Sequence, residues 1–130
     1  MARLRSQALK LLEDEGLAKA SCCYQIVPLS RPADETLHVG GECLHAPGLL
    51  PESGQLTSLG FGVCTLGPQI DQRVNSLFTE KRASLALAVD ELGIEMLFAA
   101  SRRLRRRMKV VCRRKGLSVG TQLHPPPVSG

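Results

Sequence analysis

One segment, residues 84–115, constrains the fold of this 130-residue chain more than any other. Its apolar residues recur at helical spacing in two stripes, first Leu85, Val89, Leu92 and Met96, then Leu97, Ala100, Leu104, Met108 and Val111. The second stripe is turned by about 100° from the first if an unbroken α-helix continues, and the change falls just after Gly93, a poor helix residue. The pattern predicts either one long helix that bends at this glycine or two helices that meet there. Gly116 is expected to end the helical segment.

Shorter elements are expected before this segment. A first helix is predicted over residues 6–20, which Gly16 ends or frays, and a second begins within residues 71–78. Strands are predicted over residues 22–29, 36–44 and 56–66. Gly40-Gly41 is expected to form a bulge in the middle strand, and the third strand is expected to place Phe61, Val63 and Cys64 in the core. The sequence therefore indicates an α+β fold.

Length and composition favour one small domain. A chain of 130 residues encloses one modest core, and with only 3% aromatic residues that core must consist of Leu, Val, Ile and Ala. Residues 1–120 are predicted to form the domain, and residues 121–130, which contain three consecutive prolines, an extended tail. No run approaches the ~20 apolar residues of a membrane span, and the basic start is not followed by the apolar stretch of a signal peptide. Five cysteines, an odd number, favour reduced thiols in a cytoplasmic protein.

Positive charge is concentrated near the C-terminus. Residues 1–77 hold six Lys/Arg and eight Asp/Glu, whereas residues 78–130 hold eleven and four, which together give the 17 and 12 of the whole chain. Nine of those eleven cations lie within residues 102–115, where there is no acid. The polar side of this predicted helix is entirely cationic: Arg102, Arg103, Arg105, Arg106, Lys109 and Arg113.

Three interpretations of this basic helix stay open: a solvated surface, a docking surface for an acidic protein, or a nucleic-acid-binding surface. Against nucleic acid stand the scarcity of aromatic residues for base stacking and the absence of any known nucleic-acid-binding signature.

No recognisable catalytic set is present. Soft metal ligands do occur at Cys22, Cys23, Cys43 and His45, with His38 nearby, but no C-x-x-C pair exists and the spacing fits no zinc ribbon or finger. We therefore interpret the cysteines as small core residues and leave a metal site open. No neighbour in the sequence activates a Cys–His nucleophile, and Cys64 and Cys112, which lie among apolar residues, are expected to be packed rather than reactive.

Three segments form a recognisable series. The first is CTLGP at residues 64–68, which ends a predicted strand. The second, residues 85–107, has Leu, Asp and Gly at positions 87, 90 and 93 and continues as a long helix. The third is KGL at residues 115–117, followed after a short gap by a proline-containing loop. In order and spacing, this series resembles the activation domain of cobalamin-dependent methionine synthase and its free-standing bacterial relatives, over about residues 62–127.

The resemblance implies a single α+β domain with an antiparallel twisted sheet and long helices. It implies binding of S-adenosylmethionine and docking on a corrinoid-binding protein, so that cobalamin is reached only through this partner. Such a domain positions the methyl donor, and we expect an accessory, methyltransferase-associated role rather than a self-sufficient enzyme. The alternative is a nucleic-acid-binding module that uses residues 101–115. The sequence leaves open whether the chain forms homo- or hetero-oligomers.

The resemblance also implies a cofactor site. Its expected residues are Asp90, Glu95, Gln122, His124 and Pro125. The family's loop has the form Arg-x-Ser-Pro-Gly-Tyr, and here Gln122 takes the place of the arginine, Pro126 that of the glycine and Pro127 that of the tyrosine. Because a neutral amide cannot make arginine's bidentate charged contact with a carboxylate, weak or absent binding of S-adenosylmethionine is expected.

Overall fold

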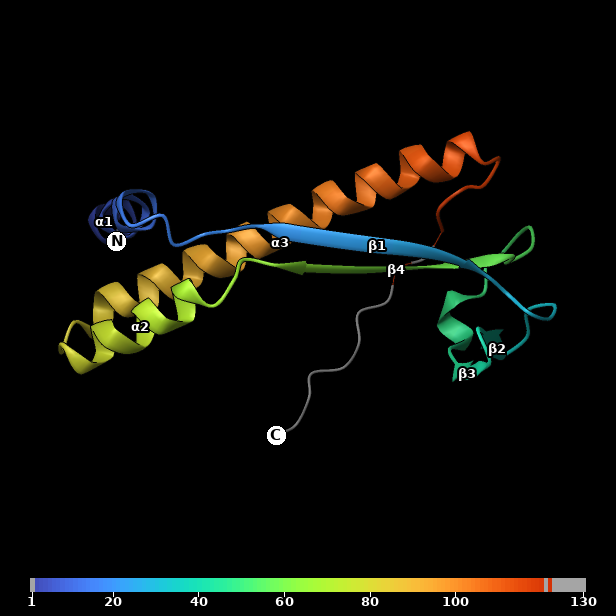
Figure 1. Cartoon of the computed structure of the whole chain (residues 1–130), viewed down its shortest axis with the longest axis horizontal. Helices are drawn as coiled ribbons and strands as arrows, with labels where there is room; N and C mark the ends of the chain where they lie inside the picture. Colours follow the sequence, from blue (N-terminus) through green and yellow to red (C-terminus); the bar gives the residue numbers. More distant parts are fainter. Residues whose placement is uncertain (1, 121, 123–130) are drawn as a thin grey trace. The chain divides into compact units, whose positions relative to one another are not determined.

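The structure is a computed structural model that describes residues 2–120 and residue 122. Figure 1 shows its elements in chain order: α1 (Ala2–Asp14), β1 (Ser21–Pro28), β2 (Thr36–Val39), β3 (Glu42–His45), a 3-10 turn η1 (Pro47–Leu49), β4 (Ser58–Thr65), α2 (Gln69–Thr79) and α3 (Ala83–Arg114). Strand β1 pairs with β4 and β2 pairs with β3, each pair antiparallel. The α+β class and the small antiparallel sheets confirm the prediction at that level. No helix in the described part of the chain is long and apolar enough to cross a membrane.

The chain forms two compact units. The first unit contains Met1–Cys23 and Gly62–Arg106, and the second contains Tyr24–Phe61 and Arg107–Gly130. The boundary runs through β1, β4 and α3 and not through a linker. One domain over residues 1–120 with a tail over residues 121–130 stays a prediction.

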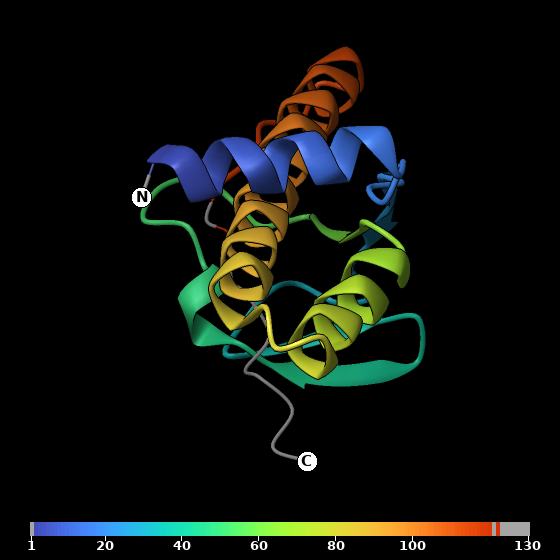
Figure 2. The ribbon, with the colours of Figure 1, turned by 90° about the vertical axis from the view of Figure 1, so that its left-hand side faces the viewer.

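Three helices build the core of the first unit. Each has an apolar stripe at helical spacing, and these stripes face one another in the arrangement of α1, α2 and the first half of α3 that Figure 2 shows. The buried residues are Ala8 and Leu12 from α1, Ile70, Val74 and Leu77 from α2, Leu85, Ala86, Val89 and Leu92 from α3, and Leu17 and Leu66 from the connecting segments. Leu85, Val89 and Leu92 of the predicted first stripe of α3 are therefore confirmed as core, and Met96 is half-buried against it.

Helix α3 is continuous through Gly93. Of the two alternatives that the sequence allowed, the structure shows one helix of 32 residues. Gly93 is buried, and a Cβ atom placed there would lie 3.3 Å from Cγ2 of Ile70. The glycine therefore lets α3 approach α2 closely, which offsets its poor helix propensity.

All three α-helices end in the same hydrogen-bond pattern. In each, one residue takes a positive φ and the next backbone N–H reaches back five residues, as in Leu17 to Leu12, Arg82 to Leu77 and Leu117 to Cys112. This is the Schellman motif, which satisfies carbonyl groups left over at a helix end. Gly16 and Gly116 occupy the positive-φ position in α1 and α3, as predicted for the two helix ends, whereas Lys81 occupies it in α2. Helix α1 covers Ala2–Asp14, so the predicted bounds, residues 6–20, are wrong at both ends.

In the second unit the predicted middle strand is a hairpin. Gly40 and Gly41 have φ of +54° and +82° and form a two-residue turn between β2 and β3, in which Leu37 pairs with Leu44 and His38 with Cys43. The predicted bulge is wrong, because two consecutive positive-φ residues reverse the chain in a type I′ turn.

The predicted burial of the third strand is also partly wrong. Phe61 and Val63 of β4 are 46% and 63% exposed, Cys64 is half-buried, and Leu59 is the strand residue in the core. The reason is local to the strand. A Cβ at Gly60 would lie 2.6 Å from Cε of Met108, so this side of β4 packs on α3 in the second unit. Phe61 follows on the opposite side of the strand, where Leu59 is buried while Phe61 and Val63 are exposed.

The second stripe of α3 is less buried than expected. Leu97 is exposed, and Leu104, Met108 and Val111 are half-buried, whereas Cys112 is buried. None of these residues belongs to the buried cluster of the first unit, whose buried members on α3 end at Leu92, with Met96 packed against it.

Candidate docking surface on the long helix

A row of four exposed side chains lies on α3 within the first unit. Ile94, Phe98, Arg102 and Arg106 are four residues apart from one another, and residues at this spacing are neighbours on a helix surface. Ile94 is 50% exposed and Phe98 57% exposed, and both arginines are exposed. We call these four residues the mixed row. Its first half is apolar and its second half is cationic.

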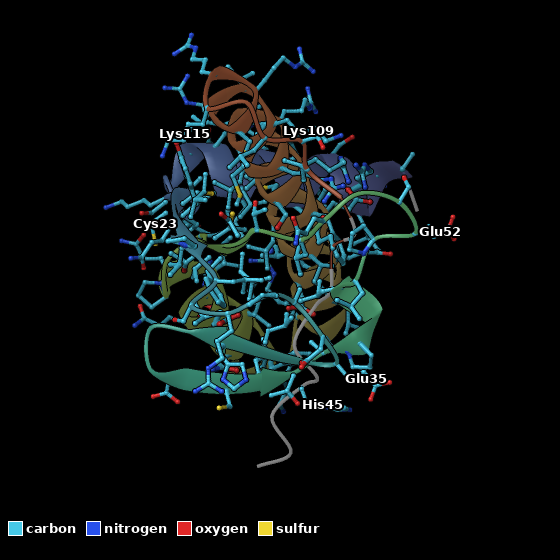
Figure 3. All side chains as sticks on the ribbon, turned by 90° about the vertical axis from the view of Figure 1, so that its right-hand side faces the viewer. Cys23, Glu35, His45, Glu52, Lys109 and Lys115 are labelled. Carbon is cyan, nitrogen blue, oxygen red and sulfur yellow. The ribbon has the colours of Figure 1, made fainter. Side chains whose placement is uncertain are left out.

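More cations flank the mixed row. Arg103 is exposed on the same helix, as are Lys109 and Arg113, while Arg105 is half-buried and has an interaction partner. Figure 3 labels Lys109, which lies in the C-terminal half of α3. In the described part of the chain, no carboxylate forms an ion pair with Arg102, Arg103 or Arg106. The prediction that these arginines stay exposed is confirmed.

The cations of α3 repel one another. Like charges three or four residues apart occur at seven pairs: 102/105, 102/106, 103/106, 103/107, 105/109, 106/109 and 109/113. Each such pair destabilises a helix by about 0.2–0.5 kcal/mol. Only the last turn offsets this, because Arg113 and Arg114 lie at the negative end of the helix dipole. Repulsion among these cations therefore lowers the stability of the unbound helix, and an anionic partner would reduce this repulsion.

The expected cofactor residue Glu95 is engaged by an arginine. Nη1 and Nη2 of Arg5 lie 3.1 and 2.8 Å from its two carboxylate oxygens, which is a bidentate ion pair between α1 and α3. The hydrogen bond from Arg5 lowers the pKa of the Glu95 carboxyl, and the same contact raises the pKa of Arg5. A ligand at Glu95 would have to displace the guanidinium.

Asp90, the other expected cofactor residue in the first unit, is not brought together with Glu95. Asp90 is exposed and lies five residues before Glu95, which places the two about 140° apart around α3. A groove of about 420 Å³ in the first unit is lined by Leu4, Arg5, Leu87, Glu91 and their neighbours and includes neither Asp90 nor Glu95. Gln122 is exposed and has an interaction partner, whereas His124 and Pro125 lie outside the described residues.

The cysteines and histidines form pairs rather than a metal centre. Within residues 2–120 and 122, no group of three or more Cys, His, Asp or Glu side chains is arranged to hold a metal ion. In the second unit, Sγ of Cys43 lies 3.4 Å from Nδ1 of His38 across the β2–β3 hairpin. In the first unit, Sγ of Cys22 lies 2.7 Å from Sγ of Cys64. All five thiols are free, and Cys112 is buried as predicted.

Two features, the apolar half of the mixed row and the role of Arg5, are not predicted by the sequence analysis. Ile94 and Phe98 belong to neither predicted stripe, and apolar residues that fall outside the core periodicity of a helix were the available signal. Arg5 was missed because nothing in the sequence links position 5 to position 95.

No protein-family model, no curated protein and no solved structure matches this chain.

Proposed function

We propose that this chain is an accessory domain in corrinoid-dependent methyl transfer that docks on an acidic surface of a corrinoid-binding protein through the mixed row of α3. The observation that carries the proposal is the row itself, in which Ile94 and Phe98 are exposed directly beside Arg102 and Arg106. Aromatic residues and arginine are the side chains that contribute most to protein interfaces.

A surface that only needs solvation would look different. Interspersed acids would keep the helix soluble and would replace repulsive i,i+4 pairs by attractive ones, yet residues 102–115 contain no acid. A solvated surface also gains nothing from an exposed phenylalanine. Repulsion among the cations and exposed apolar area both decrease when an acidic partner covers the row.

The choice of partner rests on the resemblance of residues 64–68, 85–107 and 115–117 to the methionine synthase activation domain. In this proposal cobalamin belongs to the partner. The chain holds S-adenosylmethionine weakly or not at all, since Gln122 stands in place of the family's arginine. Its contribution is positional, and the chemistry is that of the partner's cofactor.

The mixed row is tested with two matched phenylalanines. Phe98→Ala removes the aromatic ring of the row, and Phe78→Ala removes a similarly exposed ring from α2. Binding is measured by titration calorimetry against the corrinoid-binding domain of a cobalamin-dependent methionine synthase. We expect Phe98→Ala to weaken binding at least about tenfold, the usual effect of truncating an interface hot spot, and Phe78→Ala to change it less than about twofold. Equal effects of the two substitutions would contradict docking through the row.

The arginines distinguish a protein partner from a nucleic acid, the alternative partner class. The double variant Arg102→Lys, Arg106→Lys keeps both charges but removes two planar guanidinium groups that pair with carboxylates. Arg3→Lys, Arg31→Lys makes the same change at two other exposed positions. We expect only the first variant to lose affinity for the corrinoid-binding domain. If mixed-sequence DNA or RNA binds the parent and both variants equally, with steep salt dependence, and the corrinoid-binding domain binds none of them, the nucleic-acid function replaces our proposal.

A further inference from the structure

Two thiols from the two chain segments of the first unit lie next to each other. Cys22 is the second residue of β1 and Cys64 the second-last residue of β4, and their Sγ atoms are 2.7 Å apart although 42 positions separate them in the chain. Three residues before Cys22, the backbone N–H of Lys19 donates to the carbonyl of Leu66 at 3.0 Å. The two strands are therefore held together on one side of the thiol pair.

The neighbourhood of this pair suits a covalent link between the sulfurs. The two Sγ atoms, 2.7 Å apart, need to approach only to about 2.05 Å to form an S–S bond. Cys22 is exposed and Cys64 is half-buried. A small oxidant can therefore reach the sulfur of Cys22, and the sulfur of Cys64 is already in contact with the sulfur of Cys22. Cys23 points to the other side of β1, because successive side chains of a strand alternate.

In the reduced pair, Cys22 is the hydrogen-bond donor and Cys64 the acceptor. The contact with Cys64 raises the pKa of Cys22, as do burial and the neighbouring Cys23 thiol. Cys22 therefore stays protonated at neutral pH and donates to the sulfur of Cys64.

We propose that Cys22 and Cys64 are a redox pair that forms an intramolecular disulfide by exchange with a low-molecular-weight disulfide such as oxidised glutathione. One sulfur of the pair, as thiolate, attacks a glutathione sulfur, the glutathione S–S bond breaks, and one glutathione thiolate leaves. The second sulfur, after losing its proton, attacks the mixed disulfide, the Cys22–Cys64 bond forms, and the second glutathione leaves. The two thiol protons end on the two glutathiones. The protein dithiol loses two electrons and the glutathione disulfide gains them.

This disulfide would fix the end of β4 to the start of β1. Both strands continue into helices of the first unit's core, β1 from α1 and β4 to α2. The bond closes a long chain segment, which restricts the unfolded chain more than a short one. Oxidation should therefore shift the urea midpoint of unfolding to a higher concentration.

Peptide mapping of the full chain tests the proposal. The protein is incubated with oxidised glutathione, alkylated, and cleaved after glutamate without reduction. Cleavage at Glu15, Glu35, Glu52 and Glu80 separates the two sulfurs onto peptides 16–35 and 53–80 and leaves Cys43 on a third peptide. We expect the first two peptides to appear as one disulfide-linked species that dithiothreitol separates.

Variants assign the link to one cysteine. Cys23→Ser should leave the linked species and the shift in urea midpoint unchanged, while Cys22→Ser should remove both. The proposal is overturned if oxidation of the parent yields only glutathione adducts of separate peptides, a link to Cys43, or disulfide-linked dimers on a non-reducing gel. The parent's peptide map decides the question even if a variant fails to fold.

Discussion

At the residue scale, the role of Gly93 depends on a neighbour that is distant in the sequence. Gly93 was recognised as a poor helix residue, but its partner Ile70 is 23 positions away and the close approach of the two helices cannot be seen in the spacing of either. Lys81 has a positive φ that nothing in its side chain suggests. Gly16 and Gly116 were predictable as helix ends because glycine itself is the signal.

Gly93→Ala measures how closely α2 and α3 approach. In an open helix this substitution stabilises by about 1 kcal/mol. Here the new Cβ would lie 3.3 Å from Cγ2 of Ile70, which is buried and cannot move freely. We expect the gain to be lost and the free energy of unfolding, measured in urea, to fall by about 1 kcal/mol. A rise of the size seen in open helices would show that the contact is loose.

Lys81→Gly relieves a strained helix end. A side chain at a φ of +61° costs about 1–2 kcal/mol, and glycine, which has no such cost, loses part of the gain through its more flexible unfolded state. The variant should be more stable by about 0.5–1 kcal/mol in the same urea assay. The reverse change at the end of α3, Gly116→Lys, should be destabilising because φ there is +76°. No neighbouring atom lies within 4 Å of the added Cβ, so the loss would come from the backbone conformation and not from a clash.

At the element scale, helices were predicted better than strands, and the reason is how much of each element the core covers. The stripe of α3 that includes Leu85 and Val89 is enclosed by two other helices, so periodicity and burial agree. Sheet β1–β4 has only two strands, so alternation along β4 does not tell which side is covered, and Phe61 was wrongly placed in the core. Gly40-Gly41 fits either a bulge or a two-residue turn until the pairing partner is known.

Arg106→Glu tests whether α3 gives up stability for binding. Arg106 lies three or four residues from Arg102, Arg103 and Lys109, so the substitution turns three repulsive pairs into attractive ones. At low salt we expect a gain of about 1 kcal/mol in the free energy of unfolding, which shrinks in about 0.5 M NaCl because salt screens exposed charges. The same variant should no longer bind the corrinoid-binding domain. Lower stability at low salt would show that these cations do not repel one another appreciably in the folded chain.

At the scale of the whole molecule, the sequence predicted the α+β class but not how distant segments meet. The Arg5–Glu95 ion pair and the Cys22–Cys64 pair are visible only once the chain is folded. Each combines residues whose individual patterns indicated something simpler, such as a solvated charge or a core thiol. The basic side of α3 was found from sequence because a single helix contains it.

The Arg5–Glu95 ion pair should make stability depend on pH. The pKa of Glu95 is lower in the folded chain than its ordinary value. The ion pair therefore contributes fully to the free energy of unfolding above the ordinary pKa of glutamate, about 4.3, and this contribution is lost as the pH falls through the lower folded pKa. Arg5→Gln should therefore lower the urea midpoint at pH 7, and the difference from the parent should shrink at about pH 3. Glu91 also attracts Arg5, so part of the difference comes from this second carboxylate. A difference independent of pH would show that Arg5 acts through packing alone.

Binding of S-adenosylmethionine tests the resemblance across the whole chain. For the parent we expect a Kd above about 1 mM, because Gln122 lacks the arginine fork and both Glu95 oxygens are held by Arg5. Gln122→Arg should tighten binding about tenfold or more, since a charge-assisted hydrogen bond contributes about 1.5–3 kcal/mol. Gln25→Arg, which adds the same charge at an exposed position of β1, is the control for non-specific attraction of the ligand's carboxylate. Calorimetry that detects equal gains in both variants, or none in either, would mean that residues 85–127 do not form the family's cofactor site. Docking through the mixed row would then have to be explained without a methyl donor.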